Sequence, residues 1–208
     1  MKRIEAGWVI LLAVLFVGCS GGGEEGGTIG GGEPTIAPPA GPAATTLFDG
    51  SSLDGWNMTG DANWHIVEDY VEANSGGGHL VSANSYGDFK VTAEFWVDED
   101  ANSGIFIRCS DPADIGSDTC YEVNIFDKRP EQNYRTGAIV DLAEPAVKID
   151  AGGQWNTYEI TAQGSHLVVM LNGQKTVDVM DSKHASGPFT LQYGRGIVRF
   201  KNVQITPM

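Results

Sequence analysis

The sequence has few basic residues, few cysteines and no long hydrophobic run. Thirteen Lys and Arg stand against 27 Asp and Glu, which gives a formal net charge of −14 over 208 residues. So acidic a chain repels polyphosphate, which argues against a nucleic-acid partner and favours a neutral substrate, a cation or a metal. With 41% apolar residues and nine prolines, the composition also excludes a disordered, collagen-like or coiled-coil protein for the main part of the chain.

The motifs of several enzyme classes are also missing. No glycine-rich phosphate loop follows a strand-like segment, and neither G-x-S-x-G nor H-E-x-x-H occurs. The segment Tyr121–Asp127 departs from the E-x-D-x-x-E pattern of laminarinase-type sandwich glucanases, because Asn124 holds its central position. A conventional two-carboxylate glycosidase is therefore not supported. Each of the four histidines is isolated and is interpreted as a strand or loop residue: His65, His79, His166 and His184.

The first 18 residues resemble a bacterial secretion signal. Lys2 and Arg3 precede an apolar run that is too short to cross a bilayer as a stable helix. The run ends in Val17-Gly18-Cys19, which resembles the lipobox of bacterial lipoproteins. We therefore expect export, lipidation of Cys19 and anchoring to the cell envelope, at the outer membrane or the periplasmic face. The alternative is an ordinary signal peptide with a chance cysteine.

Residues 19–44 are predicted to be the lipidated cysteine and a tether. Residues 20–44 contain nine Gly and four Pro, and their only charges are Glu24, Glu25 and Glu33. Such a segment has nothing to bury, so we expect a flexible linker that lifts the following domain off the membrane. The domain itself is predicted over residues 45–208.

The domain shows no helical period but many short alternating runs. In residues 88–97, apolar side chains alternate with Lys90, Thr92, Glu94 and Trp96, as in a strand with one buried face. Asn172-Gly173 carries the signature of a type I′ hairpin turn. The pattern predicts an all-β fold, an antiparallel two-sheet sandwich. The predicted strands cover residues 63–67, 70–73, 79–82, 88–97, 103–109, 120–126, 136–140, 155–162, 166–171, 175–180, 188–193 and 197–206.

Cys109 and Cys120 are the two cysteines that remain once Cys19 is assigned to lipid. In an exported chain, two such residues flanking a short polar loop predict a disulfide. Zinc binding is the weaker alternative, because two cysteines without a nearby histidine make a poor ligand set.

Two acidic loops are candidate Ca²⁺ ligands, and no other cofactor is expected. Neither spacing matches a recognised calcium loop, and a solvated acidic rim is the alternative. The loops contain Asp98-Glu99-Asp100 and the group Asp111, Asp114 and Asp118.

Short motifs in a fixed order resemble the 3-keto-disaccharide hydrolase domain family over roughly residues 45–207. The resemblance implies a concanavalin-like jelly roll and a glycosidase that acts on sugars oxidised at C3, in an exported bacterial protein. The motifs are Leu47-Phe48-Asp49-Gly50 with Leu53-Asp54-Gly55-Trp56, Tyr86-Gly87-Asp88-Phe89, Asn102-Ser103-Gly104-Ile105-Phe106-Ile107-Arg108, Tyr121-Glu122-Val123-Asn124-Ile125 with Asp127, Thr136-Gly137-Ala138-Ile139, Trp155-Asn156-Thr157-Tyr158-Glu159-Ile160, Leu171-Asn172-Gly173, Leu191-Gln192 and Val198-Arg199-Phe200-Lys201-Asn202-Val203.

A ketone at C3 changes the chemistry that such a site needs. It acidifies the hydrogen at C2, so a base can remove this proton while the C1 oxygen leaves, and water then adds back. The route requires a base, donors for the enolate oxygen and an acid for the leaving group. Direct displacement at C1 is the alternative route.

Strand alternation selects the side chains for this chemistry. Arg108 and Glu122 fall on the less aliphatic faces of two neighbouring strands, so we expect both to line one concave sheet as catalytic residues, with Glu94 and Gln192 as substrate-binding residues. The alternative is a buried Arg108–Glu122 ion pair that holds the sandwich together.

Further candidates follow from their positions beside these strands. Asp127, at a strand end, is a second acid/base candidate or a turn-former before Pro130. Asn102 is placed to contact a sugar hydroxyl or to shape a turn, and Asn124 shares a strand face with Glu122. Trp96 shares the face of Glu94 and is a candidate for stacking on a sugar ring.

One departure from the family pattern favours a second function. Many relatives follow the Leu-Gln pair with Asp-His-Gly, whereas this chain has Tyr193-Gly194-Arg195 after Gln192. If that histidine is essential, the domain is a non-catalytic carbohydrate-binding module of the envelope. An adhesion or scaffold protein without a sugar site is a third interpretation, which predicts that the candidate residues are scattered or buried.

Overall fold

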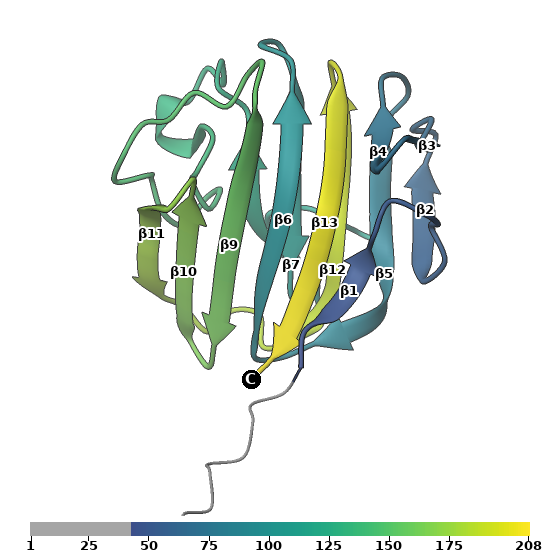
Figure 1. Ribbon diagram of the computed structural model, residues 1–208. Helices are drawn as coiled ribbons and strands as arrows, with labels where there is room; N and C mark the ends of the chain where they lie inside the picture. Colours follow the sequence, from purple (N-terminus) through teal and green to yellow (C-terminus); the bar gives the residue numbers. More distant parts are fainter. Residues whose placement is uncertain (1–42) are drawn as a thin grey trace, which may run out of the picture. The chain divides into compact units, whose positions relative to one another are not determined.

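The computed structural model describes residues 43–208, which form two antiparallel β-sheets packed face to face (Figure 1). The all-β sandwich predicted from alternation is therefore confirmed. The predictions for the secretion signal, for Cys19 and for nearly all of the tether lie outside the described residues. Within residues 43–208, no helix is long and apolar enough to cross a membrane.

The larger sheet has eight strands, in the order β11-β10-β9-β6-β13-β4-β3, with β1 paired to β13. All its pairings are antiparallel. Its strands are β1 (Thr45–Phe48), β3 (His65–Val67), β4 (Tyr70–Ala73), β6 (Phe89–Val97), β9 (Trp155–Gln163), β10 (His166–Leu171), β11 (Gln174–Met180) and β13 (Val198–Pro207).

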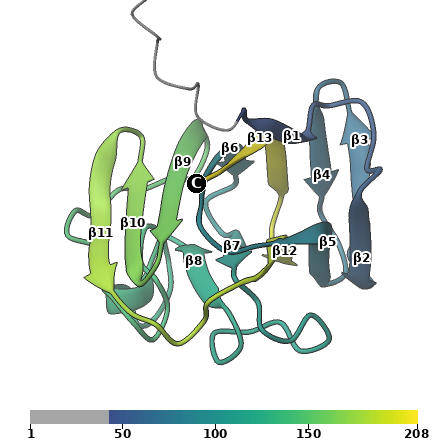
Figure 2. The same ribbon diagram turned by 90° about the horizontal axis from the view of Figure 1, so that it is seen from below.

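The smaller sheet has five strands, in the order β2-β5-β12-β7-β8. Figure 2 shows it as the second layer, opposite β9, β6 and β13. Its strands are β2 (Trp56–Gly60), β5 (Gly78–Tyr86), β7 (Asn102–Ile107), β8 (Tyr121–Ile125) and β12 (Gly187–Arg195). One short 3-10 helix, η1 (Gln132–Tyr134), follows β8.

The inward faces of both sheets form one hydrophobic core. On β6, every second residue from Phe89 to Val97 is at most 3% exposed, as the alternation predicts. Burying one such side chain stabilises the fold by roughly 1.5–3 kcal/mol. The predicted type I′ hairpin joins β10 to β11, since φ is 50° at Asn172 and 75° at Gly173.

Three segments differ from the predicted strands. Strands β1 and β2 were not predicted, because the alternating pattern is too brief in segments of four and five residues. The strand predicted over 136–140 is wrong: Ile139 makes only isolated bridges, to Val123 and Ala143. Positive φ angles at Gly137 (93°) and Asp141 (60°) prevent a continuous ladder there.

The predicted disulfide joins Cys109 to Cys120 at the two ends of the β7–β8 loop. Both cysteines pack with Phe106 and with the half-buried Ile115 in a small hydrophobic cluster separate from the core. Phe106 points away from the core, because its neighbours Ile105 and Ile107 point into it. The β7–β8 loop, called the disulfide loop below, therefore folds over the outer face of the smaller sheet.

Replacing both cysteines with serine is expected to lower the free energy of unfolding by about 3 kcal/mol, because the disulfide no longer restricts the unfolded chain. Urea unfolding of the two proteins, followed by tryptophan fluorescence, measures this difference. Ser110→Ala, beside the disulfide, is the control and should change stability far less. A change below 0.5 kcal/mol in the double variant would contradict the role assigned to the disulfide.

Candidate functional site

The outer face of the smaller sheet carries two adjacent rows of side chains, each crossing the sheet from strand to strand. In the first row, Glu122 pairs with Phe106, Phe106 with Thr190, and Thr190 with Val81. In the second row the paired residues are Asn124, Gly104, Gln192, His79 and Thr59. Cross-strand pairing thus brings Glu122, Asn124 and Gln192, three of the predicted site residues, to one face.

Glu122 is half-buried on β8, the edge strand of this sheet. Burial raises the pKa of its carboxyl to about 7, an effect that nearby Arg129 partly offsets and nearby Asp141 reinforces. Among residues 43–208, its carboxyl oxygens have no hydrogen-bond donor within reach. A carboxyl group whose pKa lies near neutrality can both take up and release a proton, as general acid–base chemistry requires.

Polar atoms without partners collect on the same face. Eight buried side-chain nitrogen or oxygen atoms of the described residues have no hydrogen-bond partner, and four of these lie in the two rows. Folded proteins pair nearly all such atoms, so these four call for polar partners from outside the protein, such as water molecules or a ligand. The four atoms are Asn124 Oδ1, Thr190 Oγ1, Gln192 Oε1 and His79 Nε2.

Gly104 lies in the middle of the second row, closely covered by neighbouring side chains. A Cβ atom at this position would lie 3.3 Å from the Phe106 ring and 3.5 Å from Gln192 Oε1. The Phe106 ring and the Gln192 amide therefore already cover this position, and a larger side chain would have to displace them.

Arg108 does not lie with Glu122, so the prediction that the two line one face is wrong. Its side chain is 1% exposed and donates hydrogen bonds to the carbonyls of Gly87 (2.8 Å) and Gly164 (2.7 Å) and to Asp88 Oδ1 (2.9 Å). A φ of 53° at Arg108 ends the alternation of β7 one residue earlier and redirects the side chain. The alternative Arg108–Glu122 ion pair is also wrong, because the carboxylate partner of Arg108 is Asp88.

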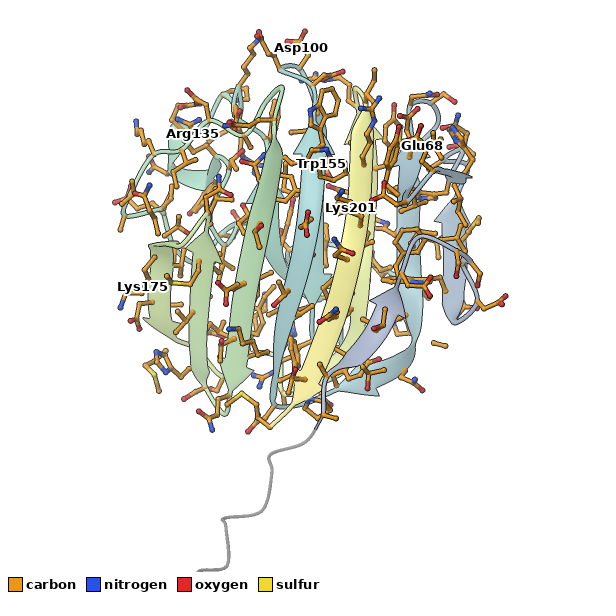
Figure 3. All side chains as sticks on the ribbon, viewed as in Figure 1. Glu68, Asp100, Arg135, Trp155, Lys175 and Lys201 are labelled. Carbon is orange, nitrogen blue, oxygen red and sulfur yellow. A yellow bond between two sulfur atoms is a disulfide. The ribbon has the colours of Figure 1, made fainter. Side chains whose placement is uncertain are left out.

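Glu94 and Trp96 lie on the other sheet, so the prediction that they line the same concave sheet is wrong. Both belong to β6 and face outward from the larger sheet, where Asn202 Nδ2 donates to Glu94 (2.7 Å) and the Arg199 guanidinium lies 4.4 Å from the Trp96 ring centre. Lys201 and Trp155 belong to this same surface, as Figure 3 shows. Alternation correctly predicted that both side chains face outward from the strand, but it could not predict to which sheet the strand belongs.

Asp127 fastens two loops together. Its Oδ1 accepts a hydrogen bond from Thr136 Oγ1 (2.5 Å), and its Oδ2 accepts from the backbone N–H groups of Ala151 (2.7 Å) and Gly152 (3.0 Å). Both oxygens are thereby occupied by the protein. This geometry does not place Asp127 with Glu122 as a second acid/base residue.

Asn102 stands at the start of β7, opposite Arg195 of β12. The histidine of the family's Asp-His-Gly segment would correspond to Gly194, where a Cβ atom would lie 2.9 Å from both Nδ2 and the backbone oxygen of Asn102. Asn102 therefore occupies the space in which a β12 side chain would have to lie. Asn102 lies two residues before Gly104 on β7, beyond the end of the second row.

One cavity of the domain is lined by charges that are already paired. A cavity of about 430 Å³ lies between Glu99, Asp127, Lys128, Asp150 and Gly152. Lys128 contacts Asp100 (2.9 Å) and Glu99 (3.7 Å), and Asp127 is bonded as described. The two-row face is therefore the better candidate site.

The residues described here do not form a recognisable metal centre. Within residues 43–208, no three His, Cys, Asp or Glu side chains are grouped closely enough to hold a metal ion. The acidic loops proposed as calcium ligands are included in this finding.

The fold defines the class of jelly-roll β-sandwiches. A protein from Parabacteroides distasonis, provisionally described as a glycosyl hydrolase, superposes with a TM-score of 0.72 at 20% identity, covering 79% of this chain and 94% of that one. A carbohydrate-binding module from Bacillus subtilis gives 0.59 at 21% identity, covering 73% and 95%. The β-glucanase of Bacillus licheniformis gives 0.58 at 13% identity, covering 82% and 100%.

Residues 43–206 match the model of the 3-keto-alpha-glucoside-1,2-lyase-like domain, and the chain belongs to this family. The resemblance inferred from the ordered motifs is thereby confirmed. No curated protein matches the chain by sequence.

The raised pKa of Glu122 predicts a specific dependence of stability on pH. Folding raises the pKa of this carboxyl from 4.5 to about 7, so the folded state holds the proton more tightly than the unfolded state. The contribution of Glu122 to the free energy of unfolding is therefore largest below pH 4.5 and falls as the pH rises through 7. Relative to the native protein, Glu122→Gln should therefore be more stable at pH 8 than at pH 4 by up to about 3 kcal/mol. Urea unfolding at both pH values measures this.

Glu68→Gln, on an exposed turn, is the matched control for that measurement. It should show a much smaller change between the two pH values. Equal pH profiles for the native protein and Glu122→Gln would contradict the burial argument.

Proposed function

We propose that residues 43–208 form a glycosidase domain that cleaves 3-keto-glycosides, with Glu122 as its acid/base residue. One observation carries the proposal: a half-buried carboxyl of pKa about 7 lies beside a row of polar atoms that have no partner in the protein. Membership of the family supports the substrate class, and the likeness to a glycosyl hydrolase and a carbohydrate-binding module supports a carbohydrate ligand.

In the proposed reaction, the Glu122 carboxylate removes the proton from C2 of the keto sugar. The electron pair of the C2–H bond moves toward the C3 carbonyl, whose oxygen becomes enolate-like and accepts a hydrogen bond from the Gln192 amide N–H. The C1–O bond then breaks, a C1–C2 double bond forms, and the protonated Glu122 returns a proton to the leaving oxygen. Addition of water across the double bond completes the hydrolysis.

The uncharged side chains of the second row suit a neutral sugar. Asn124, Gln192 and Thr59 offer amide and hydroxyl groups. In a domain this acidic, an anionic ligand would be repelled. A neutral sugar is not repelled, and its hydroxyls can both donate and accept hydrogen bonds.

We further propose that the protein is exported and held at the cell envelope through lipidated Cys19. The lipobox-like sequence and the polar linker that follows it support this proposal. Intact-mass analysis of the membrane fraction should find a diacylated Cys19 as the first residue, and Cys19→Ala should release the protein from membranes. An unmodified, unprocessed N-terminus would contradict it.

A non-catalytic carbohydrate-binding domain is the second candidate function. The observation that favours it is Gly194 at the position of the family's histidine, which leaves β12 without an imidazole. This alternative predicts that glycans bind without product release and that Glu122→Gln does not reduce binding.

Incubation of the purified domain with 3-keto-trehalose is expected to release 3-keto-glucose, with kcat/KM rising with pH through about 7 because the base must be ionised. Glu122→Gln should lower kcat by roughly 10²–10⁴-fold, since it cannot take up the proton. Glu68→Gln should retain full activity. Unchanged turnover in Glu122→Gln would refute the role of Glu122, and binding of the sugar without turnover in the native protein would favour the second function.

A further inference from the structure

Arg129 is a cation near Glu122 whose backbone is fixed by the loop that follows β8. Its N–H donates a hydrogen bond to the carbonyl of Phe126 (3.4 Å), and its own carbonyl accepts one from Gln132 Nε2 (2.6 Å). The starting point of the Arg129 side chain is therefore set by the protein, before any ligand binds.

The guanidinium of Arg129 is only weakly engaged by the protein. Its Nε atom is buried without a hydrogen-bond partner, and a carboxylate oxygen of Glu131 lies 3.6 Å from it, too far for a good hydrogen bond. The Glu131 side chain is 66% exposed, so this ion pair contributes little. The two terminal nitrogens of Arg129 are not buried, and the side chain as a whole is 23% exposed. Arg129 thus presents charged donors at the surface.

Contacts through Tyr134 place Arg129 on the Glu122 side of β8. The guanidinium carbon lies 6.0 Å from the centre of the Tyr134 ring, and the carbonyl of Tyr134 accepts a hydrogen bond from Asn124 Nδ2. Asn124 and Glu122 are two residues apart on β8, so their side chains share the outer face, about 7 Å apart along the strand. Arg129 lowers the pKa of the Glu122 carboxyl, whereas Asp141, the other charged group that acts on it, raises this pKa.

We propose that Arg129 is a second catalytic residue, which binds the C3 oxygen of the keto sugar and stabilises the negative charge that this oxygen acquires when Glu122 removes the C2 proton. The inference rests on the proposed function and adds no bond-making step to it. The carboxylate that pairs with Arg129 is Glu131 rather than Glu122, so the base is left unneutralised. Arg129 would then hold the cationic role for which alternation had suggested Arg108.

The stabilisation comes from a hydrogen bond that strengthens during the reaction. As the electron pair of the C2–H bond moves toward the C3 oxygen, a terminal N–H of Arg129 faces a growing negative charge. The interaction is therefore stronger in the transition state than with the bound ketone, which is the condition for raising kcat.

Removal of the guanidinium charge should slow turnover and also shift its pH dependence. In the full-length protein, Arg129→Gln is expected to lower kcat for 3-keto-trehalose by roughly 10²–10³-fold, the usual effect of losing one donor to a developing oxyanion. The pH at which kcat/KM reaches half its maximum should rise, because Arg129 no longer lowers the pKa of Glu122. Lys90→Gln removes a cation from the outer face of the larger sheet and, as the control, should change neither value.

Chemical rescue separates a catalytic role from a structural one. Arg129→Ala should regain part of its lost kcat when guanidinium chloride is added at concentrations too low to unfold the protein, whereas sodium chloride at the same concentrations should have no effect. Arg129→Lys keeps the charge and should lose less activity than Arg129→Gln, which tests the role in a variant that preserves the ion pair with Glu131.

Native kcat in Arg129→Gln, or a loss in Arg129→Ala that guanidinium does not restore, would overturn the inference. The proposed function would still stand if Glu122→Gln abolished turnover in the same assay. If the native protein does not cleave 3-keto-trehalose, the proposed function fails, and this inference fails with it.

Discussion

The antiparallel register of the smaller sheet is the constraint on which the candidate site depends. Five strands bring residues far apart in the sequence into line, so that Glu122, Gln192 and His79 share a face although up to 113 positions separate them. The same alternation sends their neighbours into the core. A shift of one residue in any of these strands would exchange the two sets, which would bury the polar groups and expose the apolar ones.

Sequence patterns were sufficient for the architecture and for part of the site. Alternation predicted most strands, because each has one buried face, and the spacing of Cys109 and Cys120 predicted their bond. Glu122, Asn124 and Gln192 were correctly placed on a common face, since they lie on strands adjacent in the sheet or one strand removed. Arg108 was misplaced because its backbone is left-handed, and the alternation of side chains along a strand does not predict such a residue at the strand end.

Two further gaps have different physical causes. Glu94 and Trp96 were assigned to the wrong sheet because alternation describes a strand, whereas sheet membership depends on pairing between distant segments. His79 was not selected, because nothing local distinguishes a histidine in a strand from one in a site. Its place on the two-row face depends on Gln192 as a neighbour, on Phe106 against its ring and on the loop above it. Each of these contacts is long-range.

The Cys109–Cys120 bond makes one part of the site depend on the redox conditions around the protein. The loop it closes supplies one wall of a cavity beside His79, while the sheet supplies the other. Such a bond persists only under oxidising conditions. Under reducing conditions the sheet side of this cavity would be unchanged, but no disulfide would hold the loop on its other side. The loop side of the cavity would therefore be held in place only where the surroundings keep the cysteines oxidised.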